Sequence, residues 1–173
     1  MTRYKANGIR AIACAAVLLV AQLFWSVASH AQIVALGASV VQGYGVSSGE
    51  AFPQQLEAML RAKGTPYSVS NQGVYGDTTA GVSARLDNAV PQGTGIVILL
   101  IGGNDVRRGG SVEDARQGVN DIIARLQARQ IRVINAMPYY IAARNNGMVN
   151  FDRIHLNAEG QKFMAAQLLP LIN

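Results

Sequence analysis

Gly95-Ile96-Val97-Ile98-Leu99-Leu100-Ile101 is a continuous apolar run, and the polar sequence Gly102-Gly103-Asn104-Asp105 follows it directly. An apolar run without polar alternation is typical of a strand in a parallel sheet whose two faces are both covered by helices. Ligands of such sheets bind at the carboxyl ends of the strands, which is where Asn104 would lie. The stretch therefore predicts an α/β protein with a buried parallel sheet.

The rest of the chain alternates between short apolar segments and segments of helical period. Pro138 is expected to stop the last strand, and Ser111 is a candidate cap for the third helix. This alternation predicts a three-layer α/β/α domain of the flavodoxin-like type. The predicted strands cover 33–36, 67–70, 95–101 and 131–137, and the predicted helices cover 52–60, 78–89, 111–126 and 157–171.

The first 31 residues have the composition of an export signal. Arg3, Lys5 and Arg10 precede an apolar stretch over 11–28, and Ser29-His30-Ala31 is a small-x-small cleavage site. We expect a signal peptide over 1–31 and an exported product, periplasmic or secreted, over 32–173. If the leader were retained, its apolar stretch would tether the domain to a membrane instead.

The predicted product of 142 residues is long enough for one compact domain. It lacks Cys14, the only cysteine, so no disulfide is expected. Without the three basic residues of the leader, fifteen Lys and Arg become twelve against ten Asp and Glu, and the net charge falls from +5 to +2. No basic stripe with interleaved aromatics is visible, which argues against nucleic acid as a partner.

Candidate chemical groups fall at the ends of the predicted strands. Ser39, Gly76 and Asn104 follow the first three strands, and His155 precedes the last helix with Asp152 three residues before it. Parallel strands end at one edge of a sheet, so these residues are expected to converge. Serine, histidine and aspartate are the nucleophile, base and orienting group of acyl transfer. Each residue alone has a structural reading as a cap or turn residue.

Four separated blocks of the chain resemble the SGNH (GDSL-type) hydrolases, and the second and third look closest to the thioesterase I, lysophospholipase and arylesterase branch. Their order extends from residue 35 to residue 155, which is most of the predicted product. The blocks are Ala35-Leu36-Gly37-Ala38-Ser39 with Gly43-Tyr44-Gly45, Asn71-Gln72-Gly73-Val74-Tyr75-Gly76-Asp77-Thr78, Gly102-Gly103-Asn104-Asp105, and Asp152-Arg153-Ile154-His155.

The resemblance implies a hydrolase of carboxylic esters or thioesters that forms an acyl intermediate on Ser39. His155 would be the base and Asp152 would orient it, while the N–H groups of Ser39 and Gly76 and the side chain of Asn104 would form the oxyanion hole. Histidine suits this task because its ordinary pKa lies near neutrality. The implied partner is a small-molecule ester or thioester, and oligomeric state is not indicated. Two further acids in the matching blocks, Asp77 and Asp105, are expected to be structural.

Two departures from the family pattern leave alternatives open. Ala38 replaces the aspartate that usually precedes the nucleophile, which puts the rigidity of Ser39 in doubt. Only thirteen residues, 139–151, separate Pro138 from Asp152, too few for the usual helix and fifth strand. We therefore expect a reduced sheet of four strands and a loop over 139–151, with one wall of the acyl pocket either open or supplied by Tyr139, Tyr140 and Met148. A degenerate domain that binds a ligand or partner without catalysis is the alternative function.

Other chemistries have weaker support in the sequence. Val41 occupies the position of the second glycine of an α/β-hydrolase elbow. Gly43-Tyr44-Gly45 and Gly49 are spaced one residue too far apart for a dinucleotide loop. One histidine and no cysteine in 32–173 would leave a metal only carboxylates. We therefore expect neither a metal nor an organic cofactor.

Overall fold

The computed structural model describes residues 32–65 and 67–172, so the predicted signal peptide lies outside the described residues. Four parallel strands form one sheet in the order β2-β1-β3-β4. They are β1 (Gln32–Gly37), β2 (Val69–Gly73), β3 (Thr94–Leu100) and β4 (Arg132–Asn135). The apolar run that suggested the fold is β3, which pairs with β1 and β4. The predicted four-stranded parallel sheet is confirmed.

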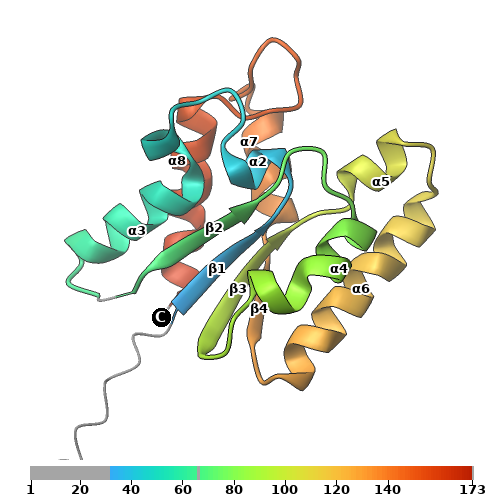
Figure 1. Ribbon diagram of the computed structural model, residues 1–173. Coiled ribbons are helices and arrows are strands. Elements are labelled where there is room, and N and C mark those ends of the chain that lie inside the picture. The colour runs from blue at the N-terminus through green and yellow to red at the C-terminus, as the bar shows by residue number, and fades with distance from the viewer. Residues whose placement is uncertain (1–31, 66, 173) are drawn as a thin grey trace, which may run out of the picture.

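Helices cover both faces of the sheet (Figure 1). One layer contains α3 (Phe52–Ala62), α7 (Met137–Asn145) and α8 (Ala158–Leu168), and the other contains α4 (Thr79–Ala89) and α6 (Val112–Ala128). Two short helices, α2 (Ser39–Gln42) and α5 (Gly103–Arg107), follow directly after strands. Single 3-10 turns occur at Ser48–Glu50 and Leu169–Leu171. No helix in the described ranges is both long and apolar enough to cross a membrane.

The two faces of β1 supply two separate cores. Because side chains alternate along a strand, Ile33 and Ala35 pack toward α3 and α8 while Val34 and Leu36 pack toward α4 and α6. All four side chains have no exposed surface. Each large apolar side chain buried in this way stabilises the fold by about 1.5–3 kcal/mol. The site at the strand ends is therefore built on a rigid support.

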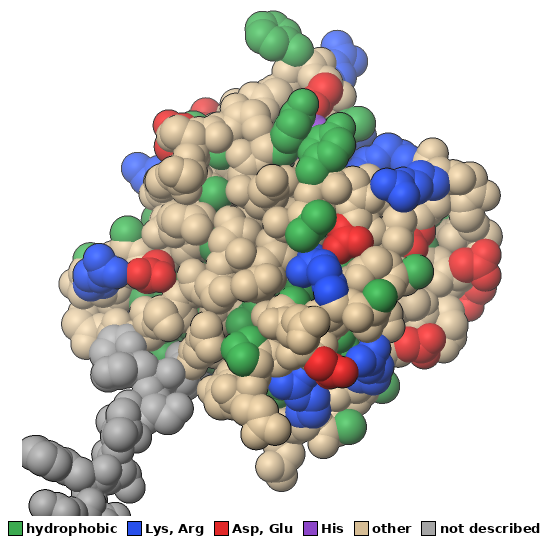
Figure 2. Space-filling model, in the orientation of Figure 1, with side chains coloured by type: hydrophobic (Ala, Val, Ile, Leu, Met, Phe, Trp, Pro, Cys, Tyr) green, Lys and Arg blue, Asp and Glu red, His purple; other side chains and the backbone are tan. Residues whose placement is uncertain are grey.

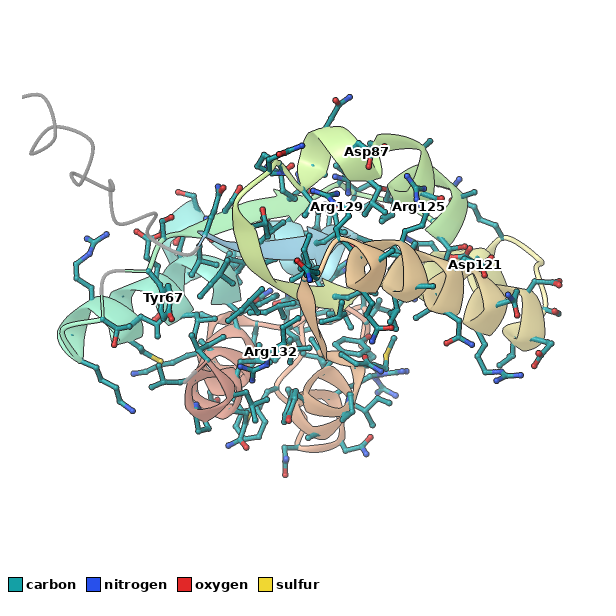
Figure 3. All side chains as sticks on the ribbon, turned by 90° about the horizontal axis from the view of Figure 1, so that it is seen from below. Tyr67, Asp87, Asp121, Arg125, Arg129 and Arg132 are labelled. Atoms are coloured by element: carbon teal, nitrogen blue, oxygen red, sulfur yellow. The ribbon has the colours of Figure 1, made fainter. Side chains whose placement is uncertain are left out.

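Polar contacts fix the helices to this support. Thr78, Ser111 and Asn157 cap α4, α6 and α8 through their side-chain oxygens, as expected for Ser111. Between α4 and α6, Asp87 forms ion pairs with Arg125 and Arg129 at 3.4 and 3.6 Å (Figure 3). These contacts lie at the surface, so they orient the two helices more than they stabilise them.

The segment after β4 differs from the prediction. Residues 139–151 were expected to be a loop, but α7 occupies Met137–Asn145 and only the remainder is irregular. Pro138 lies in the first turn of this helix, where its missing N–H is harmless, instead of stopping a strand. The chain is too short for a helix and a fifth strand, yet it is long enough for a helix alone. The sheet is reduced as expected, while a flanking helix that was expected to be missing is present.

Candidate active site

Ser39 lies at the carboxyl end of β1, as the first residue of α2. It is buried, with 4% of its surface exposed. Gly37 permits the tight approach of this turn to β3, because a Cβ at that position would lie 2.1 Å from the carbonyl oxygen of Leu100. The backbone N–H of Ser39 belongs to the first turn of α2 and so has no acceptor within the helix.

Ser39, His155 and Asp152 form a continuous hydrogen-bonded chain. Nδ1 of His155 lies 2.5 Å from Oδ2 of Asp152, and Nε2 lies 2.8 Å from Oγ of Ser39. A carboxylate can only accept, so Nδ1 carries the hydrogen of the neutral imidazole and Nε2 accepts from the serine hydroxyl. The structure thus brings together the three residues predicted from the sequence, in the arrangement that nucleophile activation requires.

A tight turn after α7 holds the acid and the base in place. The N–H of Asn150 donates to the carbonyl of His155 at 2.8 Å, and Val149 forms an isolated antiparallel bridge with Leu156. Oδ1 of Asp152 accepts the N–H groups of Ile154 and His155, both at 2.9 Å. Hydrogen bonds from the side chain and backbone of His155 lower the pKa of Asp152 from its ordinary value of 3.8 to about 2. The carboxylate that orients the imidazole therefore remains ionised down to strongly acidic pH.

The other two residues assigned to the oxyanion hole lie beside Ser39. Gly76 has a φ of 74°, a conformation that favours glycine, and its carbonyl accepts from Arg108 at 2.8 Å. The side-chain nitrogen of Asn104 donates to the carbonyl of Asp77 at 2.7 Å, and its oxygen accepts from Arg107 at 2.7 Å. An amide nitrogen carries two hydrogens, so the second remains available for a substrate oxygen. Ser39, Gly76, Asn104 and His155 line one cavity of about 350 Å³.

A bracing network under the nucleophile could not be recognised in the sequence. Arg85 of α4 donates to the carbonyls of Gly37 and Gln72 at 3.2 and 2.9 Å and pairs with Asp77 at 2.8 Å. The ends of β1 and β2 are thereby tied to the loop that carries Gly76. Ala38 offers no side-chain hydrogen bond at this turn, so Arg85 supplies a brace from the neighbouring helix. A lone arginine in an amphipathic helix gives no signal of this role.

Asp105 has the structural role expected of it. Its carboxylate accepts the N–H and the hydroxyl of Thr79, the latter at 2.5 Å. The contact joins α5, which carries Asn104, to the start of α4. Asp77 is likewise structural, since it pairs with Arg85.

Two exposed tyrosines pack against the imidazole of His155. The ring centroid of Tyr44 lies 4.6 Å from that of His155, and the ring of Tyr75 lies 4.8 Å from Tyr44. Tyr75 is nearly parallel to His155, at 6.3 Å. The two tyrosines form a wall over the histidine, which is 8% exposed while they are about half exposed.

A second cavity, of about 260 Å³, also borders Ser39 and shares Asn104, Arg107 and Ile154 with the first. It is mainly apolar, and α7 supplies one wall of it. Of the three residues expected to form this wall, Tyr140 lines the cavity, whereas Tyr139 and Met148 pack against the core. The lining also includes Val40, Leu100, Ile101, Met137, Ile141, Ile154, Arg107 and Arg144. Because residues 137–145 form a helix, this wall of the cavity consists of side chains of α7 and not of the predicted loop.

A larger groove, of about 860 Å³, lies between the end of α7 and the 149–157 turn. Neither Ser39 nor His155 lines it. In the described part of the chain, no three His, Cys, Asp or Glu side chains are grouped closely enough to share a metal ion.

Comparison with known proteins shows the family of the chain. The chain matches the model of the GDSL-like lipase/acylhydrolase family over residues 35–151. It is 27% identical over 139 residues to the esterase TesA of Pseudomonas aeruginosa, covering 75% of this chain and 67% of that protein.

Solved structures share the fold. An esterase, EstA from Pseudoalteromonas sp., superposes with a TM-score of 0.71 at 17% identity, covering 82% of this chain and 96% of the other. AlinE4, described as an SGNH-hydrolase family esterase, is 39% identical with a TM-score of 0.55, over 59% of this chain and 56% of its own. The family match over most of the described residues, together with the fold, shows that the chain belongs to the GDSL-like lipase/acylhydrolase family, the SGNH-type ester hydrolases.

Proposed function

We propose that the chain hydrolyses carboxylic esters or thioesters through an acyl intermediate on Ser39. The observation that carries the proposal is the buried contact of 2.8 Å between Oγ of Ser39 and Nε2 of His155, with Asp152 on the far nitrogen. A serine hydroxyl is a weak nucleophile unless an adjacent base takes its proton. In this chain Nε2 of His155 lies within hydrogen-bond distance of the hydroxyl, and the carboxylate of Asp152 favours the tautomer that has its hydrogen on Nδ1.

The first half of the reaction transfers the acyl group to the enzyme. Oγ of Ser39 attacks the carbonyl carbon as its proton passes to Nε2 of His155, and the carbonyl oxygen becomes an oxyanion. The N–H groups of Ser39 and Gly76 and the amide of Asn104 would donate to this oxygen. One such donor is typically worth about 10²–10³ in rate. The intermediate collapses when the leaving oxygen or sulfur takes the proton from Nε2.

The second half returns the enzyme to its starting state. Water gives a proton to Nε2 and attacks the acyl carbonyl, and the ester bond to Ser39 breaks as Oγ recovers the proton. General acid–base catalysis of this kind contributes about 10²–10⁴-fold. The products are a carboxylic acid and the alcohol or thiol.

A domain that binds a ligand without catalysis is the competing function. Ala38 and the reduced sheet favour it, because the aspartate that usually precedes the nucleophile and the usual fifth strand are both missing. The triad contacts and the Arg85 brace favour catalysis, since a binding module gains nothing from a serine hydrogen-bonded to an oriented imidazole. We therefore place catalysis first.

The test is hydrolysis of 4-nitrophenyl butyrate and of butyryl thioesters by the full chain. Ser39→Ala and His155→Ala should each reduce kcat by about 10⁴-fold or more, and to similar extents, because members of a catalytic unit are strongly non-additive. Asn104→Ala should reduce it by about 10²–10³-fold. Undiminished turnover by the Ser39→Ala protein would refute the mechanism, and absence of turnover by the folded wild type would favour the binding module.

The proposal includes location outside the cytoplasm. The composition of 1–31 supports it, through the basic start, the apolar stretch and the small residues at 29 and 31. Mass spectrometry of the protein from an expressing cell should find an N-terminus at Gln32. A mature protein that retains residues 1–31 would contradict this expectation.

A further inference from the structure

We propose that the acyl group of the substrate ends in an anion, of which a carboxylate is the simplest, and that Arg107 and Arg144 bind it. The inference rests on the proposed function and deepens it. It assigns the substrates as monoesters or monothioesters of dicarboxylic acids, in which the second carboxylate is free. Four observations carry it: which cavity takes the acyl group, which residues line it, which elements supply its two arginines, and which charges lack an acid.

The position of His155 distinguishes the two cavities next to Ser39. The imidazole must return a proton to the leaving group, so the leaving group lies on its side of the nucleophile. His155 and Tyr75 line the cavity of about 350 Å³, whereas neither lines the cavity of about 260 Å³. The smaller cavity therefore receives the acyl chain.

The smaller cavity has an apolar lining and two cationic groups. Leu100, Ile101 and Met137 can contact the methylenes of an acyl chain. Arg107 comes from α5 and Arg144 from α7, so two arginines line the cavity from different elements. Arg107 also lines the cavity of about 350 Å³, and Arg144 also lines the groove of about 860 Å³. A simple fatty acyl chain has no use for two charges in its binding site.

Tyr140 lines the same cavity as the two arginines. Its hydroxyl donates to the carbonyl of Ile154 at 2.9 Å, and its ring lines the cavity wall. Burial raises the pKa of Tyr140, the positive charges of Arg144 and Arg107 oppose that rise, and the negative charge of Asp152 adds to it. Tyr140, Arg107 and Arg144 all line this one cavity.

Neither arginine is paired with an acid in the described ranges. Arg107 donates to the neutral side chain of Asn104, and Nε of Arg144 donates to the carbonyl of Arg153. Five other arginines of the same ranges do pair with Asp or Glu: Arg61, Arg85, Arg116, Arg125 and Arg129. Arg108 and Arg153 likewise form no ion pair in these ranges, and Arg108 lines the neighbouring cavity. Positive charge without an acidic partner therefore gathers around the active site, where Figure 2 shows basic side chains grouped over α5 beside apolar ones. Guanidinium is the group that binds carboxylates in a planar, bidentate manner.

The experiment measures the hydrolysis of three esters by the full chain. The acyl groups of the three share one carbon backbone length and differ at the far end. The esters are 4-nitrophenyl hydrogen adipate, its methyl-capped diester, and 4-nitrophenyl hexanoate. In the wild type, kcat/KM for the free carboxylate should exceed that for the capped diester by about tenfold or more, as for a hydrogen bond to a charged group. Arg144→Gln should bring this ratio to about one, because the variant keeps a polar side chain without the charge. Added salt should reduce the ratio in the wild type.

Arg116→Gln is the matched control, since Arg116 is an exposed arginine on α6 that lines none of these cavities and pairs with Glu113. It should keep the wild-type ratio. Equal rates for the free and capped adipates in the wild type, or a ratio unchanged in Arg144→Gln, would overturn the inference while hydrolysis of the hexanoate leaves the proposed function intact. If a folded wild type hydrolyses none of the three, the proposed function fails and the inference fails with it.

Discussion

Both ring nitrogens of His155 and its aromatic ring are in contact with other side chains. Asp152 fixes Nδ1, Ser39 meets Nε2, and the rings of Tyr44 and Tyr75 cover its face. The ring cannot flip without breaking the bond to the carboxylate. These contacts lead to one prediction for the acid and one for the aromatic wall.

The stability conferred by Asp152 should depend on pH. Its pKa is lower in the folded protein, at about 2, than the ordinary value of 3.8, so folding is favoured by the ionised form. This contribution is fully present above pH 3.8 and is lost as the pH falls toward 2. Urea unfolding of wild type and Asp152→Asn should show a difference in unfolding free energy at pH 5 that narrows by pH 2. A difference that is constant over this interval would contradict the assignment.

The aromatic wall should act through the ring of Tyr44 and not through its hydroxyl. Tyr44→Ala removes a contact of about 0.5–1.5 kcal/mol and should lower kcat by about threefold to tenfold. Tyr44→Phe preserves the ring and should retain wild-type kcat. Steady-state kinetics on 4-nitrophenyl butyrate separates the two cases. If the phenylalanine variant lost as much as the alanine variant, the hydroxyl would be the active part.

At the scale of elements, the nucleophile depends on contacts between segments far apart in the sequence. Arg85 of α4 ties the ends of β1 and β2 together, and Gln161 of α8 ties α2 to α3. Gln161 is fully buried, accepts the N–H of Phe52 at 2.9 Å and donates to the carbonyl of Val40 at 3.0 Å. The turn around Ser39 is thus held from both layers of helices.

Loss of the Arg85 brace should affect turnover more than substrate binding. Arg85→Met should lower kcat by roughly tenfold to a hundredfold with little change in KM, because small displacements of a nucleophile are costly. Arg85→Lys should fail to rescue, since an ammonium cannot reproduce three contacts made by one planar guanidinium. Equal changes in kcat and KM, or full rescue by lysine, would show that the brace is not needed for placement.

The buried amide of Gln161 should contribute to stability. Gln161→Met keeps the volume but leaves the N–H of Phe52 and the carbonyl of Val40 without this partner, at a cost of about 1–3 kcal/mol. Chemical denaturation of the two proteins at neutral pH measures the loss. A variant as stable as the wild type would mean that water replaces both contacts.

At the scale of the whole molecule, the features that depend on local pattern were predictable from the sequence. The apolar run of β3 indicated a parallel sheet, and parallel strands necessarily bring Ser39, Gly76 and Asn104 to one edge. The helix α7 was missed because Pro138 was interpreted as a strand terminator, although proline is equally suited to the first turn of a helix. Arg85 and Arg144 were missed because their partners lie outside their own helices, and Arg107 was missed because its contact with Asn104 within α5 does not reveal the cavity that it lines. The long-range part of the site thus required the structure.

The central claim is that Ser39 is an activated nucleophile despite Ala38 and the reduced sheet. Its most direct test is labelling of the full chain by a fluorophosphonate, followed by mass spectrometry of the modified peptide. We predict a single adduct on Ser39 that is absent in Ser39→Ala and greatly reduced in His155→Ala. A folded wild-type protein that takes up no label, or a label that persists in Ser39→Ala, would contradict the account.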